Sequence, residues 1–203
     1  MCSGSGIFKG RDMPLKKVHG VALKLTAQNR IGLTSIVHQE QRGDLWCWAA
    51  CISMVLQGLG CKLGQCSIAG TTLSQKCKDC ASPCTVKEKA YKKCDVDYPI
   101  KEIDTLWKGF KVQANPPQRP ISSKAVLDEL KAGHALEILL GSSDDGGHLV
   151  LIIDAVSASA GSTKILVADP SSTTHEVSPK SLKEALKDLN WGEWRLTWTG
   201  LHF

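Results

Sequence analysis

Apolar residues recur at helical spacing between residues 46 and 57, which is the clearest pattern in the chain. The recurring positions are Trp48, Ala49, Ile52, Val55 and Leu56. They predict a buried helix of about three turns, with Asp44 as a cap or first-turn acid and Gly58 as part of its stop. Shorter helical pieces are expected around 65–73 and 86–93.

The second half of the chain has a strand-like rhythm instead. Apolar runs lie at 135–141, 148–156, 163–169 and 174–178, separated by turns that carry Gly, Ser and Asp. A helix over 179–189 and a last strand over 194–203 follow, while Ser122 or Ser123 caps an amphipathic helix over 124–133. Helices first and strands afterwards predict an α+β fold with an antiparallel sheet.

These patterns divide the chain into an arm and one domain. Residues 1–35 are expected to form an N-terminal arm, and residues 36–203 the domain. The domain begins with a helical, cysteine-rich half (36–114). A proline-rich linker (115–121) then leads to a β-rich half (122–203).

Composition narrows the class of protein further. The 203 residues are 42% apolar and 22% charged, which is typical of a folded globular chain. The net charge of +5 is mild, and many of the lysines lie among cysteines, so no nucleic-acid partner is expected. No apolar run approaches the ~20 residues that span a bilayer, so no membrane span is expected either.

Nine cysteines lie within the first 94 residues, more than a reduced cytosolic protein usually carries. Six of them form an even set: Cys61, Cys66, Cys77, Cys80, Cys84 and Cys94. Disulfides are the leading expectation for this set, with free thiols or a structural zinc at Cys77, Cys80, Cys84 and Cys94 as alternatives. No other cofactor is expected. Because the N-terminus lacks a secretory signal, we expect secretion or delivery by a non-classical route, with a cytoplasmic location as the alternative.

Two cysteines of the first helix differ in position. Cys47 lies at the helix start, where unpaired backbone N–H groups and the positive end of the helix dipole stabilise a thiolate. Cys51 lies one turn further in, where an apolar setting raises the pKa of a thiol. The sequence therefore favours Cys47 as the nucleophile and Cys51 as a structural residue, although Cys47 could also be a plain buried thiol.

A base and its partner can be placed by counting along a hairpin. His148 opens a strand directly after Gly146 and Gly147, and the turn centred near residue 159 pairs residues whose numbers sum to about 317. This brings Asp169 opposite His148, where the carboxylate could orient the imidazole. The alternatives are a structural or metal-binding His148, the latter with Asp144 and Asp145, and an Asp169 that caps a turn.

An oxyanion donor is also available upstream of the nucleophile. Gln41 lies six residues before Cys47, and Gly43 allows the chain to bend between them. The amide of Gln41 and the backbone N–H of Cys47 would supply two donors, with Gln39 as a less favoured substitute.

With these residues in place, the chain resembles the papain-like cysteine peptidases, and within them the bacterial branch of effector proteases and bacteriocin-leader peptidases. The matching segments are 41-QRGDLWCWAACISMVL-56, 65-QCSIA-69, 129-ELKAGHALEILL-140, 146-GGHLVLIIDA-155 and 167-VADPSS-172. The resemblance implies a papain-like fold, with the Cys47 helix packed on an antiparallel half-barrel. It also implies a nucleophile, base, orienting carboxylate and oxyanion donor at Cys47, His148, Asp169 and Gln41. The cysteine-dense segment departs from the family, and the lack of an attached transporter argues against leader trimming.

The expected function is therefore hydrolysis of peptide or isopeptide bonds through a thioester, by a bacterial effector, toxin or maturation protease. We expect a monomer that acts on a protein or peptide substrate. The same nucleophile could instead serve a transglutaminase or deamidase acting on Gln side chains. The third possibility is a binding module with a vestigial cleft.

Overall fold

The computed structural model describes residues 35–73, 94–141, 147–157, 162–189 and 191–202. The expectations for the N-terminal arm and for a helical piece around 86–93 lie outside these residues, apart from Ser35. Within the described residues, no helix is both long enough and apolar enough to cross a membrane.

A five-stranded antiparallel sheet forms the centre of the fold, with the order β4-β3-β2-β1-β5. Its strands are β1 (Ala135–Gly141), β2 (His148–Ser157), β3 (Thr163–Ala168), β4 (Thr174–Val177) and β5 (Glu193–Leu201). The first three are buried on both faces for most of their length, which explains their near-continuous apolar sequences.

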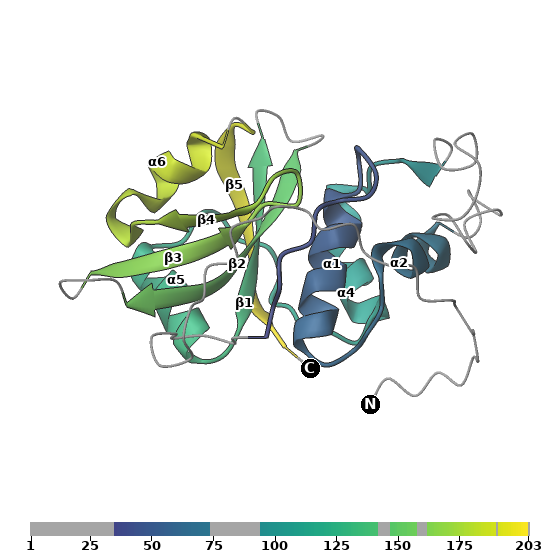
Figure 1. Ribbon diagram of the computed structural model, residues 1–203, viewed down its shortest axis with the longest axis horizontal. Helices are drawn as coiled ribbons and strands as arrows, with labels where there is room; N and C mark the ends of the chain where they lie inside the picture. Colours follow the sequence, from purple (N-terminus) through teal and green to yellow (C-terminus); the bar gives the residue numbers. More distant parts are fainter. Residues whose placement is uncertain (1–34, 74–93, 142–146, 158–161, 190, 203) are drawn as a thin grey trace, which may run out of the picture.

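Helices cover both faces of this sheet (Figure 1). On one face lie α1 (Cys47–Gly58), α2 (Gln65–Thr72), η3 (Ile100–Glu102) and α4 (Ile103–Gly109). On the other lie α5 (Ser123–Lys131), η5 (Pro179–Ser181) and α6 (Leu182–Lys187). The α+β class is confirmed, as is the packing of the helix that begins at Cys47 against the sheet.

Alternate residues of β1 divide between the two cores. Ala135 and Leu139 pack toward α1, while Leu136, Ile138 and Leu140 pack toward α5 and α6. Each helix layer therefore buries its apolar face against one side of the same strand.

Three local features differ from the sequence-based expectations. The first helix begins at Cys47, and its N-cap is Trp46, so Asp44 is not the cap. The helix α4 was not anticipated, although Ile103, Leu106 and Trp107 form one buried face at helical spacing. At the helix that was expected over 124–133, the Ser122 hydroxyl accepts from the backbone N–H of Ala125 and so caps α5.

Residues 115–121, which were expected to form a linker, cover the outer edge of the sheet along β5. Gln118 exchanges two backbone hydrogen bonds with Thr197 of β5, at 3.0 and 2.8 Å. The backbone N–H of Asn115 donates to the carbonyl of Thr199 at 2.9 Å. Prolines keep this stretch out of a full strand, yet it pairs with the edge that β5 would otherwise expose.

Candidate active site

The start of α1, the start of β2 and the end of β3 carry the three residues that the sequence marked for catalysis. Cys47 is the first residue of α1, and His148 is the first residue of β2. Asp169 directly follows β3. All three residues are buried, and α1 packs against β2.

His148 and Asp169 are joined by a hydrogen bond of 2.6 Å between Nε2 and Oδ1. Because a carboxylate only accepts, Nε2 must carry the proton and donate it. The other ring nitrogen, Nδ1, is then unprotonated in the neutral imidazole and can accept a proton. This hydrogen bond therefore selects the tautomer that a general base requires.

The contact forms in spite of a different strand register. Ala168 pairs with Leu151, and the bulge between Ile152 and Asp154 shifts the remaining pairs. The residue numbers of paired residues thus sum to 319 (151 + 168) near the site, whereas the position of the turn in the sequence predicted a sum of about 317. The Asp169 side chain spans the offset to reach His148.

Asp169 is held by several donors besides the histidine. Its Oδ1 accepts from the backbone N–H and the hydroxyl of Ser171, both at 2.8 Å, and its Oδ2 accepts from the Ser172 hydroxyl at 3.0 Å. Burial alone would raise the pKa of Asp169, but the hydrogen bonds from His148 and Ser171 outweigh it and hold that pKa well below its usual range. The carboxylate therefore both caps its turn and orients the histidine.

The Cys47 thiol is more deeply buried than its position at a helix start suggested. Burial raises the pKa of Cys47 to about 12, while the backbone N–H groups of Leu149 and Trp48 act in the opposite direction. The N–H groups at the helix start thus lower the pKa of Cys47, but the loss of hydration on burial raises it by more. Because the N–H of Leu149 contacts the sulfur, Cys47 lies against the residue that follows His148.

Cys51 lies one helical turn further into the core than Cys47. Its thiol is completely buried and lies 3.5 Å from the backbone carbonyl of Leu149. Burial also raises the pKa of Cys51 well above the ordinary thiol value. It packs in the core below Cys47, as a structural residue would.

Gln41 is anchored near the Asp169 turn. Its backbone N–H donates to the carbonyl of Pro170 at 2.7 Å, and its side-chain Nε2 donates to the carbonyl of Asp44 at 2.6 Å. Its Oε1 is buried and has no hydrogen-bond partner among the described residues. In this conformation the amide donor proposed for an oxyanion is already engaged by Asp44.

Two aromatic residues that the sequence did not single out as functional contact His148 and Asp169. The indole of Trp191 stacks on the His148 ring, with centroids 4.1 Å apart and planes 22° apart. Trp191 is 42% exposed, so it covers the imidazole from the solvent side. His38 approaches the backbone carbonyl of Asp169 at 2.8 Å through Nε2 and stabilises the same turn.

Gly147 explains why a small residue precedes the histidine. A Cβ atom at this position would lie 2.2 Å from the backbone carbonyl oxygen of Leu140 and 2.8 Å from Leu139. Leu140 is the residue that pairs with His148 across the sheet. Glycine therefore allows β1 and β2 to come together just before the imidazole.

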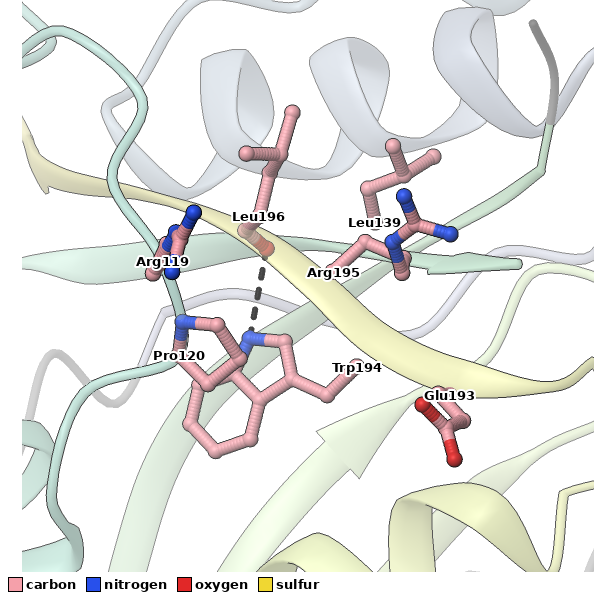
Figure 2. A pocket seen from close by; sticks show the side chains of 7 residues that line it. All are labelled: Arg119, Pro120, Leu139, Glu193, Trp194, Arg195 and Leu196. Carbon is pink, nitrogen blue, oxygen red and sulfur yellow. Dashed lines mark hydrogen bonds between the residues drawn. The ribbon is translucent and has the colours of Figure 1, made fainter. Parts of the chain in front are cut away.

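A cavity of about 500 Å³ opens beside the start of β5 (Figure 2). Its lining residues are Arg119, Pro120, Leu139, Glu193, Trp194, Arg195 and Leu196. Leu139 of β1 pairs with Leu196 of β5 on one side and with Leu149 of β2 on the other, and none of Cys47, His148 and Asp169 lines the cavity. It offers both apolar walls and charged groups to a bound molecule.

The cysteine-rich segment is only partly described. Cys66 and Cys94 are disulfide-bonded, which confirms the leading expectation for these two members of the set, whereas Cys77, Cys80 and Cys84 lie outside the described residues. The acidic partners suggested for a metal-binding His148 also lie outside them. Among the described residues, no group of three or more His, Cys, Asp or Glu side chains could hold a metal ion.

Comparison with solved structures adds a distant likeness. No protein-family model and no curated protein matches the chain. The crystal structure of the Pseudomonas avirulence protein AvrPphB is similar to it, with a TM-score of 0.40 and 9% sequence identity. The alignment covers 83% of this chain and 98% of that chain. The relationship is one of fold only, so the roles of residues are argued from this chain's own geometry.

Proposed function

We propose that the chain is a cysteine peptidase that hydrolyses peptide or isopeptide bonds through a thioester at Cys47. The observation that carries this proposal is the 2.6 Å hydrogen bond from His148 to Asp169, which leaves Nδ1 of the imidazole able to accept a proton. Cys47 lies against the next residue, Leu149, at the start of α1. A nucleophile, a base and an orienting carboxylate are the parts that covalent catalysis requires.

In the proposed reaction, His148 takes the proton of the Cys47 thiol as the sulfur attacks the carbonyl carbon of the substrate. Asp169 stabilises the imidazolium, and Trp191 keeps water away from it and offers the face of an aromatic ring to its charge. The imidazolium then protonates the leaving amine, and a thioester remains on Cys47. His148 activates a water molecule that hydrolyses the thioester and restores the thiol.

Such a thiol does not need a low pKa in the unliganded protein. Burial favours the neutral form of Cys47, so the proton moves only when a substrate is present and the base is correctly placed. The backbone N–H at the start of α1 and the Gln41 amide, once released from the Asp44 carbonyl, would stabilise the developing oxyanion.

We further propose that the protein acts outside a reducing cytoplasm on a protein or peptide substrate, as an effector, toxin or maturation protease. The disulfides at Cys66 and Cys94 support an oxidising location.

The test is cleavage of a proteome-derived peptide library, with products identified by mass spectrometry. Wild type should generate new peptide ends, while Cys47→Ala and His148→Ala should generate none although their circular dichroism spectra are unchanged. Cys51→Ala is the matched control and should retain cleavage, because its thiol takes no part in the reaction. Release of ammonia without new peptide ends would contradict the peptidase assignment and indicate deamidation.

A further inference from the structure

One carboxylate supports the turn that leads into α1. The turn is closed by the backbone N–H of Trp46, which donates to the carbonyl of Gly43 at 3.1 Å. The two N–H groups inside it, those of Asp44 and Leu45, both donate to Asp95, at 2.9 Å to Oδ2 and 2.8 Å to Oδ1. A carboxylate can accept both because it has two oxygens and no hydrogen to donate. Asp95 therefore pairs with the donors that the turn itself leaves unused.

The chain on both sides of this carboxylate is also held against the start of α1. The indole of Trp46, the N-cap, donates from Nε1 to the carbonyl of Cys94 at 2.8 Å, and Trp48 Nε1 donates to the carbonyl of Val96 at 3.2 Å. Both tryptophans are buried, and Cys94 is disulfide-bonded. The residues on either side of the carboxylate are thus hydrogen-bonded to the residues on either side of the proposed nucleophile.

The peptide group between Asp44 and Leu45 links this carboxylate to the proposed oxyanion donors. Its N–H donates to Asp95 Oδ1. Its carbonyl accepts from Gln41 Nε2 at 2.6 Å. In a planar trans peptide the N–H and the C=O point in opposite directions, so a partner that fixes one also fixes the other. Asp95 therefore sets the direction of the carbonyl that holds the Gln41 amide.

Gly43 makes room for the carboxylate. A Cβ atom at this position would lie 2.6 Å from Oδ1 of Asp95 and 2.8 Å from the Trp46 indole. A side chain here would displace the carboxylate from the turn, whereas glycine allows the close approach. The glycine that was expected to bend the chain thus also lets Asp95 reach the two N–H groups.

We propose that Asp95 is a positioning residue for acyl transfer at Cys47. It fixes the turn before α1, and with it the two proposed oxyanion donors, the backbone N–H of Cys47 and the side-chain amide of Gln41. Such donors stabilise a developing oxyanion best when their positions are fixed before the reaction begins. Without the carboxylate, two N–H groups of the turn lose their partner and the peptide can rotate. The role rests on the proposed function in that it treats Cys47 as the nucleophile.

Acylation of Cys47 by p-nitrophenyl acetate tests this role without any peptide recognition. The sulfur attacks the ester carbonyl through an oxyanion, a thioester forms, and p-nitrophenolate leaves and is measured by its absorbance, with the rate of Cys47→Ala subtracted. Alkylation by iodoacetamide is measured in parallel, because this displacement forms no oxyanion. Asp95→Asn replaces one accepting oxygen by an NH₂ group that faces an N–H. It should slow acylation roughly tenfold and slow alkylation much less.

A matched control changes the same type of residue in the same segment. Asp97→Asn also removes one negative charge, but it keeps an oxygen for the backbone N–H of Tyr98, which donates to Asp97 Oδ1 at 2.8 Å. This variant should not slow acylation. Equal slowing in Asp97→Asn and Asp95→Asn would overturn the proposal, because loss of charge alone would then explain the effect.

A double mutant separates positioning from a general loss of structure. If Asp95 acts through the oxyanion donors, Asp95→Asn should slow acylation by a smaller factor when Gln41 is already replaced by Ala. The same factor with and without Gln41→Ala would overturn the proposal. So would acylation and alkylation slowed equally by Asp95→Asn, which would indicate a displaced thiol.

Hydrogen exchange of the wild-type protein, followed by NMR, gives an answer even if Asp95→Asn does not fold. Asp44 and Leu45 are exposed and lie outside the helices and strands, so their amides should exchange fast unless Asp95 holds them. Slow exchange of both amides supports the proposal, and fast exchange of both would overturn it. Absence of peptide cleavage together with the expected acylation rates would refute the peptidase proposal and leave the role of Asp95 standing. Peptide cleavage together with unchanged acylation in Asp95→Asn would overturn the role of Asp95 alone.

Discussion

The pH dependence of stability is set in part by Glu137, and its size can be worked out from the structure. Glu137 lies in β1, is 1% exposed and accepts a hydrogen bond from Trp107 Nε1 at 2.8 Å. Burial raises the pKa of its carboxyl from an ordinary 4.5 to about 8 in the folded protein. The native state therefore binds a proton more tightly than the unfolded chain between these two values. Because the free energy of unfolding falls with pH wherever the native state holds the extra proton, this group makes the protein less stable as pH rises through that window.

Each pKa unit corresponds to about 1.4 kcal/mol, so the window of 3.5 units (8 − 4.5) represents a loss of about 5 kcal/mol from this group alone. The loss is complete above pH 8, where both states are ionised. Asp169 acts in the opposite direction, since its pKa is lowered, but its window lies below the ordinary carboxyl value of 3.8. The pH ranges in which the two groups change the stability therefore do not overlap.

Urea unfolding of wild type and Glu137→Gln from pH 5 to pH 8.5 measures this difference. The stability of wild type relative to the variant should fall steadily across the range. Glu176→Gln, at an exposed position of β4, is the matched control, and its free energy of unfolding should change with pH as that of wild type does. Parallel curves for wild type and Glu137→Gln would refute the reasoning, because they would mean that Glu137 gains no proton affinity on folding.

Three further substitutions test other parts of the structure. Gly147→Ala places a methyl group against the Leu140 carbonyl, so it should cost about 1–3 kcal/mol of unfolding free energy and lower turnover; equal thermal stability would contradict the contact. Trp191→Ala should lower kcat several-fold while Trp191→Phe, which keeps an aromatic ring over His148, largely restores it, and an equal loss in both would argue against stacking as the cause. Ser122→Ala should cost about 1 kcal/mol in chemical denaturation through the lost cap of α5, with no effect on turnover.

Much of the fold could be predicted because its elements follow simple periodicities. The helix at Cys47 has an apolar repeat near 3.6, and the strands are short apolar runs between turns. Ser122 could be chosen as a cap from its place before an amphipathic segment. The α4 helix was not predicted because it has only seven residues, although Ile103, Leu106 and Trp107 have helical spacing.

The candidate site was harder to predict where three-dimensional detail decides the chemistry. Counting along the hairpin brought His148 to Asp169, but the pairs beside the turn already sum to 320, and the bulge at Ile153 brings the sum only to 319 near the site. The apolar run reveals neither the exact centre of the turn nor the bulge. The pKa of Cys47 depends on how much water packing removes, which the helix start alone does not fix. Trp191 lies far from His148 in sequence, so only the folded chain shows that the rings stack.

The identity of the nucleophile is the central claim, and covalent labelling tests it most directly. The protein is treated at neutral pH with a peptide-based epoxide that reacts with activated cysteines, and the labelled residue is identified by peptide mass spectrometry. Labelling of Cys47 in wild type, with little in His148→Ala, is the predicted result. Labelling of Cys51 ahead of Cys47, or equal labelling of Cys47 with and without His148, would contradict the account.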